Sequence, residues 1–270
     1  MVPGEPTGYE DEPREQFQEL PAELLHLLYH YERVSQDLTQ ELSYYRSQLQ
    51  QRCTRLLELG CGTGLLSNNL QGNGLEVTGI DLDRRALSFS KGAEGRRLVQ
   101  MDMRHLGLRP GFDAVLIGQN TLNLLTEPAD MKHCLQEIRR ILVPPGLLLA
   151  HLYCSDSEHQ AHPEGRLLQF QLFDHPEGGN IIKESIRSYD PKKRRLYLEQ
   201  RFKIRRCCTE LPNFNYRHCL ELAALSRREW LELFNSAGFF IESWSPGFAD
   251  ISVSPHSTLH LVARSEPSSS

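Results

Sequence analysis

The sequence predicts an α/β protein with a doubly wound, mostly parallel sheet and a second, antiparallel sheet inserted into it. Over residues 52–153, strand-like apolar runs alternate with helical patterns, which is typical of parallel strands joined by right-handed crossovers. Within that region, an apolar run ends in spaced glycines, Gly60, Gly62 and Gly64. After residue 153 a run of strands replaces the alternation up to residue 224, which indicates a separate sheet.

The segment before the parallel sheet is predicted to form a helical cap. Residues 1–14 are rich in Gly, Pro and acids and are expected to be disordered. Over residues 15–51, leucines and tyrosines recur near the helical period in two successive stripes, with the first helix starting near Glu15 or Pro21. Two helices packed over the open edge of the glycine loop fit this pattern.

The glycine loop is the strongest functional signal. It follows the buried strand 56–59, which contains an acid, Glu58, and it leads into a helical pattern. Glycines let a ligand approach the main chain, and the start of a helix carries partial positive charge. The next strand, 77–81, ends in Asp81, about twenty residues after the glycines, where nucleotide-binding folds place an acid on the ribose.

These residues, with three further segments in order, resemble the class I S-adenosylmethionine-dependent methyltransferases. The three segments match the third-strand tip, the fourth strand, and the helix, turn and fifth strand of that family: 100–103, 112–117 and 138–149. An NAD-dependent oxidoreductase fits less well. Its G-x-G-x-x-G fingerprint places the third glycine one turn into the helix, whereas here the glycines alternate and Leu65 follows.

The resemblance implies a seven-stranded sheet and S-adenosylmethionine as cofactor. It also implies a role for each residue of the motifs. The cofactor-binding residues would be Gly60, Cys61 and Gly62 along the amino-acid tail, Glu58 at its ammonium group, Asp81 on the ribose, Leu82 beside the adenine, Asp102 and Met103 at the adenine amino edge and face, and Gln119 after the fourth strand. A turn acid that only pairs with Arg104 is the alternative for Asp102.

Methyl transfer from a sulfonium is an in-line displacement that depends mostly on placement, so a dedicated base is optional. Tyr29, Tyr31 and His151 are the candidates for a catalytic role. Core-facing aromatic residues and a histidine that only hydrogen-bonds are the alternatives. After the fourth strand, the Asn/Asp-Pro-Pro-Tyr motif of relatives that methylate nucleic-acid bases or protein amides is absent, which argues against DNA as a partner.

Residues 154–224 are predicted to form the antiparallel sheet, which in small-molecule members of the family is a lid over the acceptor. A Pro-Lys-Lys turn cluster predicts a hairpin within it. The expected strands are 167–173, 181–189, 195–206 and 216–224. Arg187, Arg201 and Arg217 lie mid-strand, where an inward-facing arginine could hold an acidic substrate, but the residues alone do not fix which side each one faces.

Residues 225–265 return to the core. Ser226 and Glu229 form a capping-box pattern before a helix at 227–236, and strands are expected at 239–243 and 258–263. The Ser-rich tail, 266–270, is expected to be disordered.

Composition restricts the partners. A net charge of −5 gives no bulk attraction to nucleic acid, and the apolar runs are too short to span a membrane. The seven cysteines contain no C-x-x-C, and the spacing of His151, Cys154, Asp156, His159 and His162 matches no familiar metal site, so we expect neither metal nor disulfides. Reduced cysteines and the absence of a signal-peptide pattern favour a cytoplasmic protein.

The expected function is methyl transfer to N or O of a small-molecule acceptor. The alternatives are methylation of a tRNA base or a protein side chain, and a catalytically silent cofactor-binding regulatory or scaffold protein. The residues specify neither the acceptor nor the oligomeric state.

Overall fold

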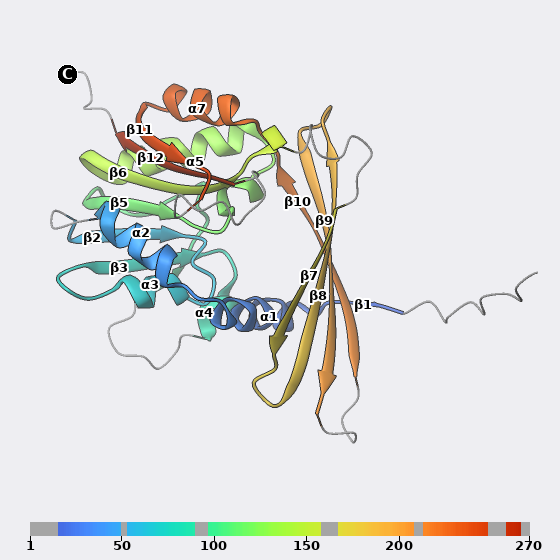
Figure 1. The fold of residues 1–270 in the computed structure, drawn as a ribbon. Helices are drawn as coiled ribbons and strands as arrows, with labels where there is room; N and C mark the ends of the chain where they lie inside the picture. The colour runs from blue at the N-terminus through green and yellow to red at the C-terminus, as the bar shows by residue number, and fades with distance from the viewer. Residues whose placement is uncertain are drawn as a thin grey trace, which may run out of the picture.

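The computed structural model of the chain describes residues 16–49, 53–89, 97–157, 167–207, 213–247 and 258–265. Both predicted disordered ends, 1–14 and 266–270, lie outside the described residues. Two sheets make up the protein, and the helix α1 (Ala22–Ser35) lies between them (Figure 1).

The larger sheet has seven strands in the order β11-β12-β6-β5-β2-β3-β4. Strands β4, β3, β2, β5 and β6 are mutually parallel. At one edge, β12 pairs antiparallel with β6 and β11 pairs antiparallel with β12, so only β12 runs against the other strands. Their bounds are β2 (Arg55–Leu59), β3 (Glu76–Asp81), β4 (Arg97–Gln100), β5 (Phe112–Ile117), β6 (Leu142–Tyr153), β11 (Phe239–Ser245) and β12 (Thr258–Ser265). The doubly wound, mostly parallel seven-stranded sheet is thus confirmed.

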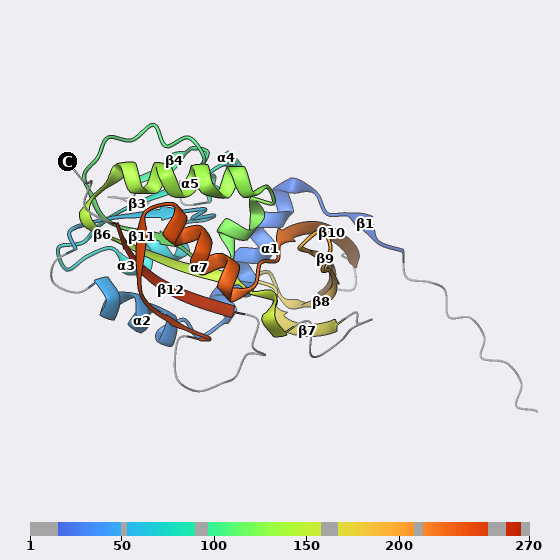
Figure 2. The same ribbon diagram turned by 90° about the horizontal axis from the view of Figure 1, so that it is seen from above.

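Helices cover both faces of this sheet (Figure 2). The alternation of strand side chains supplies a core to each face, because successive residues point to opposite sides. Leu57 and Val115 pack on one side with Ile138 and Trp230, and Leu56 packs on the other with α2 and α3. The helices are α2 (Thr39–Leu49), α3 (Leu65–Leu70), α4 (Arg84–Ser88), α5 (Pro128–Ile141) and α7 (Arg227–Ser236), with the short 3-10 helices η1 (Thr121–Leu124) and η2 (Ser155–Ser157).

The second sheet, called the lid below, has the order β1-β10-β9-β8-β7. Its strands are β1 (Gln18–Glu19), β7 (Leu167–Asp174), β8 (Gly179–Asp190), β9 (Arg195–Arg206) and β10 (Phe214–Ala223). The predicted hairpin of β8 and β9 is confirmed, with Asp190 opposite Arg195 across the turn. The first helix begins at Ala22, next to Pro21, which was the later of the two predicted starts, because the chain before it forms β1 and pairs with β10.

The lid is fastened to the core at one end. Asn123 in η1 donates through Nδ2 to the carbonyl oxygens of Tyr153 (3.0 Å) and Ala223 (2.8 Å). The α7 helix follows β10 directly, and its predicted capping box between Ser226 and Glu229 is present with both hydrogen bonds. The end of β10 is therefore fixed beside the end of β6.

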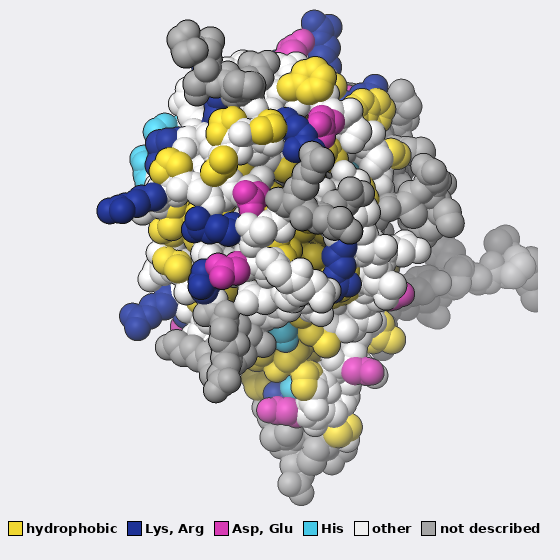
Figure 3. Space-filling model, turned by 90° about the vertical axis from the view of Figure 1, so that its left-hand side faces the viewer, with side chains coloured by type: hydrophobic (Ala, Val, Ile, Leu, Met, Phe, Trp, Pro, Cys, Tyr) yellow, Lys and Arg dark blue, Asp and Glu magenta, His cyan; other side chains and the backbone are white. Residues whose placement is uncertain are grey.

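The side of the core opposite the lid carries charges of both signs scattered among apolar side chains (Figure 3). It presents no single-sign patch of described residues that would suggest a charged partner there. Among the described helices, none combines the length and the apolar character that crossing a membrane requires.

Candidate active site

The glycine loop and the residues after β5 lie at the point where the strand order of the seven-stranded sheet reverses. From β2 the chain moves outward to β3 and β4, and it then returns to β5 on the other side of β2. In open α/β sheets, ligands bind at the carboxyl ends of the strands at such a point. The glycine loop follows β2, and Gln119 and Asn120 follow β5, so they lie at this position.

The glycine loop requires its glycines for two different reasons. Gly60 has φ +65°, and a Cβ there would come within 2.2 Å of Cγ2 of Thr121. Gly62 has φ +55°, and a Cβ there would meet nothing within 4 Å. The first glycine allows close packing of the loop on η1, whereas the second leaves one side of the main chain open to a ligand.

Asp81 lies beside the loop at the end of β3. Its carboxylate accepts hydrogen bonds from the backbone N–H groups of Gly62 and Asp83, both at 2.8 Å. The side chain is only partly buried. It is therefore held in one orientation next to the open side of Gly62.

Glu58 is buried beneath the loop, with 4% of its surface exposed. The Ser67 hydroxyl donates a hydrogen bond to its carboxyl group. Burial raises the pKa of Glu58 to about 7, against the weaker opposing effect of Ser67, and the nearby acids Glu41 and Asp81 raise it further. A cation brought to this position would favour the ionised form.

Cys61, within the loop, and Leu82, after β3, lie in different environments. The Cys61 backbone N–H donates to the Ile80 carbonyl oxygen at 2.9 Å, and burial raises the pKa of its thiol well above the usual range. The thiol is therefore neutral and packs beside Gly79. Leu82, by contrast, is 65% exposed and lies two residues before α4.

Asp102 forms a close pair with Arg104. Both of its carboxylate oxygens accept from the Arg104 guanidinium, with the shortest contact at 2.7 Å, and this pairing lowers the pKa of Asp102. Met103 is partly buried against the main core. The geometry matches the alternative of a turn acid paired with Arg104, so an adenine contact by Asp102 stays a prediction.

Gln119 and Asn120 adopt the left-handed backbone conformation, with φ of +50° and +58°. Gln119 donates through Nε2 to Oε1 of Glu41 at 3.0 Å, which links the end of β5 to α2. The Asn120 side-chain oxygen is buried and has no hydrogen-bond partner among the described residues. Such an acceptor is costly unless a ligand or water satisfies it.

A polar stripe on α1, which the sequence reading missed, crosses these strand ends. His26, His30 and Arg33 recur at helical spacing on one face. The ring of His26 contacts Asp83 Oδ2 at 3.0 Å, that of His30 contacts Thr63 Oγ1 at 2.8 Å, and Arg33 pairs with the buried Glu41. The i, i+4, i+7 spacing of polar groups was the available signal.

The three catalytic candidates lie in different places. Tyr29 donates to Gln200 of the lid, and Tyr31 contacts the His175 ring at a centroid distance of 5.8 Å. His151 is buried next to His260, with ring centroids 4.4 Å apart, and burial lowers its pKa well below the usual range. A histidine so shifted is neutral and a weak base, so it is a poor candidate for proton removal.

Within the described residues, no group of three His, Cys, Asp or Glu side chains is arranged to hold a metal ion. In the sequence cluster considered above, Cys154 Sγ lies 3.1 Å from Asp156 Oδ2. Two other members of that cluster, His159 and His162, lie outside the described residues.

Residues 57–150 match the family model for a methyltransferase domain. A Bacillus subtilis (strain 168) protein, YqeM, whose name assigns it to the methyltransferases, is 36% identical over 115 residues, which cover 41% of this chain and 47% of that protein. A cypemycin N-terminal methyltransferase of Streptomyces is 36% identical over 107 residues, 37% of this chain and 42% of its own. The chain therefore matches less than half the length of these relatives.

Solved structures share the fold over nearly the whole chain. The sugar N-methyltransferase KedS8 from Streptoalloteichus sp ATCC 53650 superposes with a TM-score of 0.73 at 18% identity, covering 99% of both chains. CalS10, an amino pentose methyltransferase from Micromonospora echinaspora solved with S-adenosylmethionine, gives 0.71 at 20% identity, covering 93% of this chain and all of that one. At these identities, the likeness establishes the fold alone.

Proposed function

Because residues 57–150 form a class I methyltransferase domain, we propose that the chain is an S-adenosylmethionine-dependent methyltransferase acting on N or O of a small molecule. The observation that carries the proposal is the open side of Gly62 next to Asp81, inside the segment that matches the family. The relatives named above are methyltransferases, and CalS10 was solved with this cofactor.

The residues of the site fit the cofactor chemically. S-adenosylmethionine supplies an electrophilic methyl group on a sulfonium and brings an ammonium group and ribose hydroxyls. Glu58 would accept the ammonium group, and the Asp81 carboxylate would accept hydrogen bonds from the ribose. Gly60, Cys61 and Gly62 would lie along the tail, and Leu82, Asp102 and Met103 would lie toward the adenosine end. Gln119, after β5, would complete the cofactor site.

The acceptor would lie between the carboxyl ends of the strands and the lid. Asn120 supports this position, because its buried carbonyl oxygen can accept an N–H or O–H from the acceptor and orient the attacking lone pair. The names of KedS8 and CalS10 favour an amine on a sugar-like molecule. The buried His151 is a weak base, so it would not take a proton from an amine acceptor. The amine would therefore bind in its neutral form, and the methylated product would release its proton to solvent.

The direct test is formation of S-adenosylhomocysteine from S-adenosylmethionine with a panel of amines, amino sugars and phenols. Turnover of one of these acceptors supports the proposal. Turnover only of tRNA or a peptide would replace it with the first alternative. Cofactor binding without turnover of any acceptor would favour the silent regulatory protein.

We also propose a cytoplasmic location. The described residues contain six free cysteines, of which Cys61, Cys134 and Cys154 are buried. Reduced thiols of this kind are typical of a reducing compartment.

A further inference from the structure

The strand register decides which of the three mid-strand arginines of the lid faces the core. Side chains directly opposite in an antiparallel pair share a face. Arg187 follows the buried Lys183 and Ser185 at two-residue spacing on β8, so it points to the same, inner side. Arg201 is opposite Glu184, and Arg217 is opposite Arg201, which places both on the outer side.

The inner face of the lid is rich in apolar groups, and none of its described residues is an acid. On β8 the inner positions are Ile181, Lys183, Ser185, Arg187 and Tyr189, and register adds the described residues opposite them on β7, β9 and β10. The acids Glu184, Glu199 and Glu221 alternate with these positions and face outward. Any positive charge on the inner face must therefore be balanced from outside the lid.

Lys183 receives that balance from α1. Its Nζ lies 2.7 Å from Oε2 of Glu32, and both side chains are buried. On the outer face, Lys203 pairs with Glu184 at 2.8 Å and Arg201 with Glu199 at 2.7 Å.

Arg187 differs from these cations. Its Nε is buried and has no hydrogen-bond partner among the described residues, and no ion pair joins its guanidinium to a described acid. An unsatisfied buried donor of this kind costs about 1–3 kcal/mol. A guanidinium presents a planar fork of donors that matches a carboxylate or a phosphate.

Residues that lie side by side on the inner face of neighbouring lid strands form a row. The row that contains Arg187 lies between two rows that contact the rest of the protein. On one side, Tyr189 and Leu196 pack with Tyr153 at the end of β6. On the other side, Tyr29 of α1 donates to Gln200. Rows on one face are about 7 Å apart. Arg187 therefore faces the space between α1 and the carboxyl ends of the core strands, which is where the acceptor would enter.

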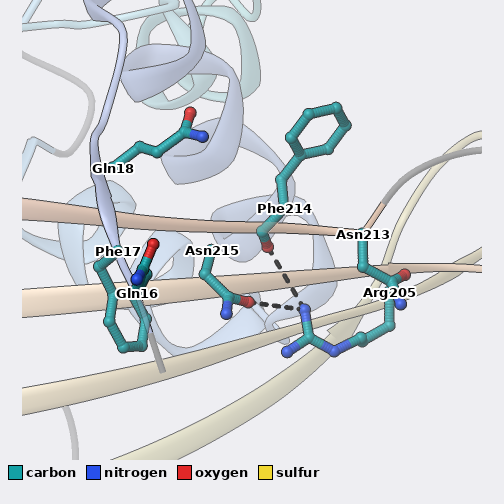
Figure 4. A pocket seen from close by; sticks show the side chains of 7 residues that line it. All are labelled: Gln16, Phe17, Gln18, Arg205, Asn213, Phe214 and Asn215. Carbon is teal, nitrogen blue, oxygen red and sulfur yellow. Dashed lines mark hydrogen bonds between the residues drawn. The ribbon is translucent and has the colours of Figure 1, made fainter. Parts of the chain in front are cut away.

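A polar hollow at the β1 edge of the lid has no comparable free cation. It has a volume of about 340 Å³, and Arg205 lines it. The Arg205 guanidinium donates to Asn215 Oδ1 at 2.8 Å and to the Phe214 carbonyl oxygen at 3.3 Å (Figure 4). Its Nη1 is thus bonded within the sheet.

We propose that Arg187 binds an anionic group, a carboxylate or a phosphate, carried by the acceptor molecule. The proposal rests on the proposed function, which assigns this face of the lid to the acceptor. It places the substrate in the class of acidic amines or alcohols.

The test is an NMR titration of the full ¹⁵N-labelled chain with two probes, sodium pyrophosphate and sodium succinate, at constant low ionic strength. The Arg187 Nε–H signal is identified as the one that Arg187→Gln removes. Arg201→Gln is the matched control, because it removes an outward arginine from the same sheet. Titration with S-adenosylhomocysteine is recorded separately.

We expect one probe to shift the Arg187 signal to saturation, with at least tenfold weaker binding in Arg187→Gln and less than a twofold change in Arg201→Gln. Pyrophosphate as the better probe indicates a phosphate, and succinate indicates a carboxylate. Equal binding by wild type and Arg187→Gln, or no shift with either probe, overturns the proposal. If the wild-type chain shows the anion-induced shift but does not bind S-adenosylhomocysteine, the proposed function alone is overturned.

Discussion

His30 Nδ1 lies 2.8 Å from Thr63 Oγ1, and this contact fixes the first helix on the glycine loop. Thr63 is the residue between Gly62 and Gly64, so α1 closes directly over the loop. On an adjacent face the same helix carries Glu32 and Tyr29, which contact the lid. In the proposed function, α1 would therefore join the two sites that a methyl transfer needs, one for the cofactor and one for the acceptor.

Removal of this contact should loosen the loop. His30→Ala is expected to weaken S-adenosylhomocysteine binding about fivefold, because one partly buried hydrogen bond contributes about 1 kcal/mol. Thr63→Val should have a similar effect, and the double variant should lose little more. Calorimetric titration measures all three. Fully additive losses would show that the two side chains act independently.

Asp81→Asn should weaken S-adenosylmethionine binding tenfold or more, because charge-assisted hydrogen bonds contribute about 1.5–3 kcal/mol. Asp113→Asn is the matched control. Asp113 likewise accepts from two backbone N–H groups, those of Thr54 (2.8 Å) and Arg55 (2.9 Å). It lies near the start of β5, however, at the amino ends of the parallel strands and away from the glycine loop. Equal affinities of the folded Asp81 and Asp113 variants would remove Asp81 from the site.

Glu58 should make the protein less stable as the pH rises. Its pKa is raised from 4.5 to about 7 in the folded state, so between these values the folded protein keeps a proton that the unfolded chain has released. The stabilisation is complete below pH 4.5 and is lost as the pH rises through 7, with a total of about 3 kcal/mol. Urea unfolding of wild type and Glu58→Gln across this range isolates the effect. A pH dependence identical in both proteins would contradict it.

The buried Lys183–Glu32 pair should be sensitive to removal of one partner. Glu32→Gln leaves a buried charge unbalanced and is expected to lower the free energy of unfolding by about 3–5 kcal/mol. The double replacement Glu32→Leu with Lys183→Met should recover most of this loss. Glu19→Gln, which breaks the exposed pair with Arg217, should cost less than about 1 kcal/mol. Denaturant unfolding measures these free energies. Equal stability of Glu32→Gln and Glu19→Gln would contradict the prediction.

Local signals predicted much of the fold. Ser226 and Glu229 fixed the start of α7, and Gly238, in the left-handed conformation, follows its end. The alternation of strands and helices predicted the seven-stranded sheet, because each of its cues lies within a short stretch of chain. The short β1 strand had no such cue, since it depends on an open edge of β10 almost 200 residues away.

The parts of the site that depend on tertiary contacts were not predictable. The inward position of Arg187 depends on the register of β8 with β9, and a shift of one residue would turn it outward. The contacts of His26 and His30 depend on where α1 crosses the strand ends. The arginine beside Asp102 was visible in the sequence, but whether the two side chains pair is a question of geometry.

Calorimetric titration of the full chain with S-adenosylmethionine and S-adenosylhomocysteine, at matched salt, tests the central claim most directly. The account predicts micromolar binding of both, which would establish the cofactor and leave the acceptor as the question to pursue. Binding of neither would contradict it, because the glycine loop, Glu58 and Asp81 would then have another role.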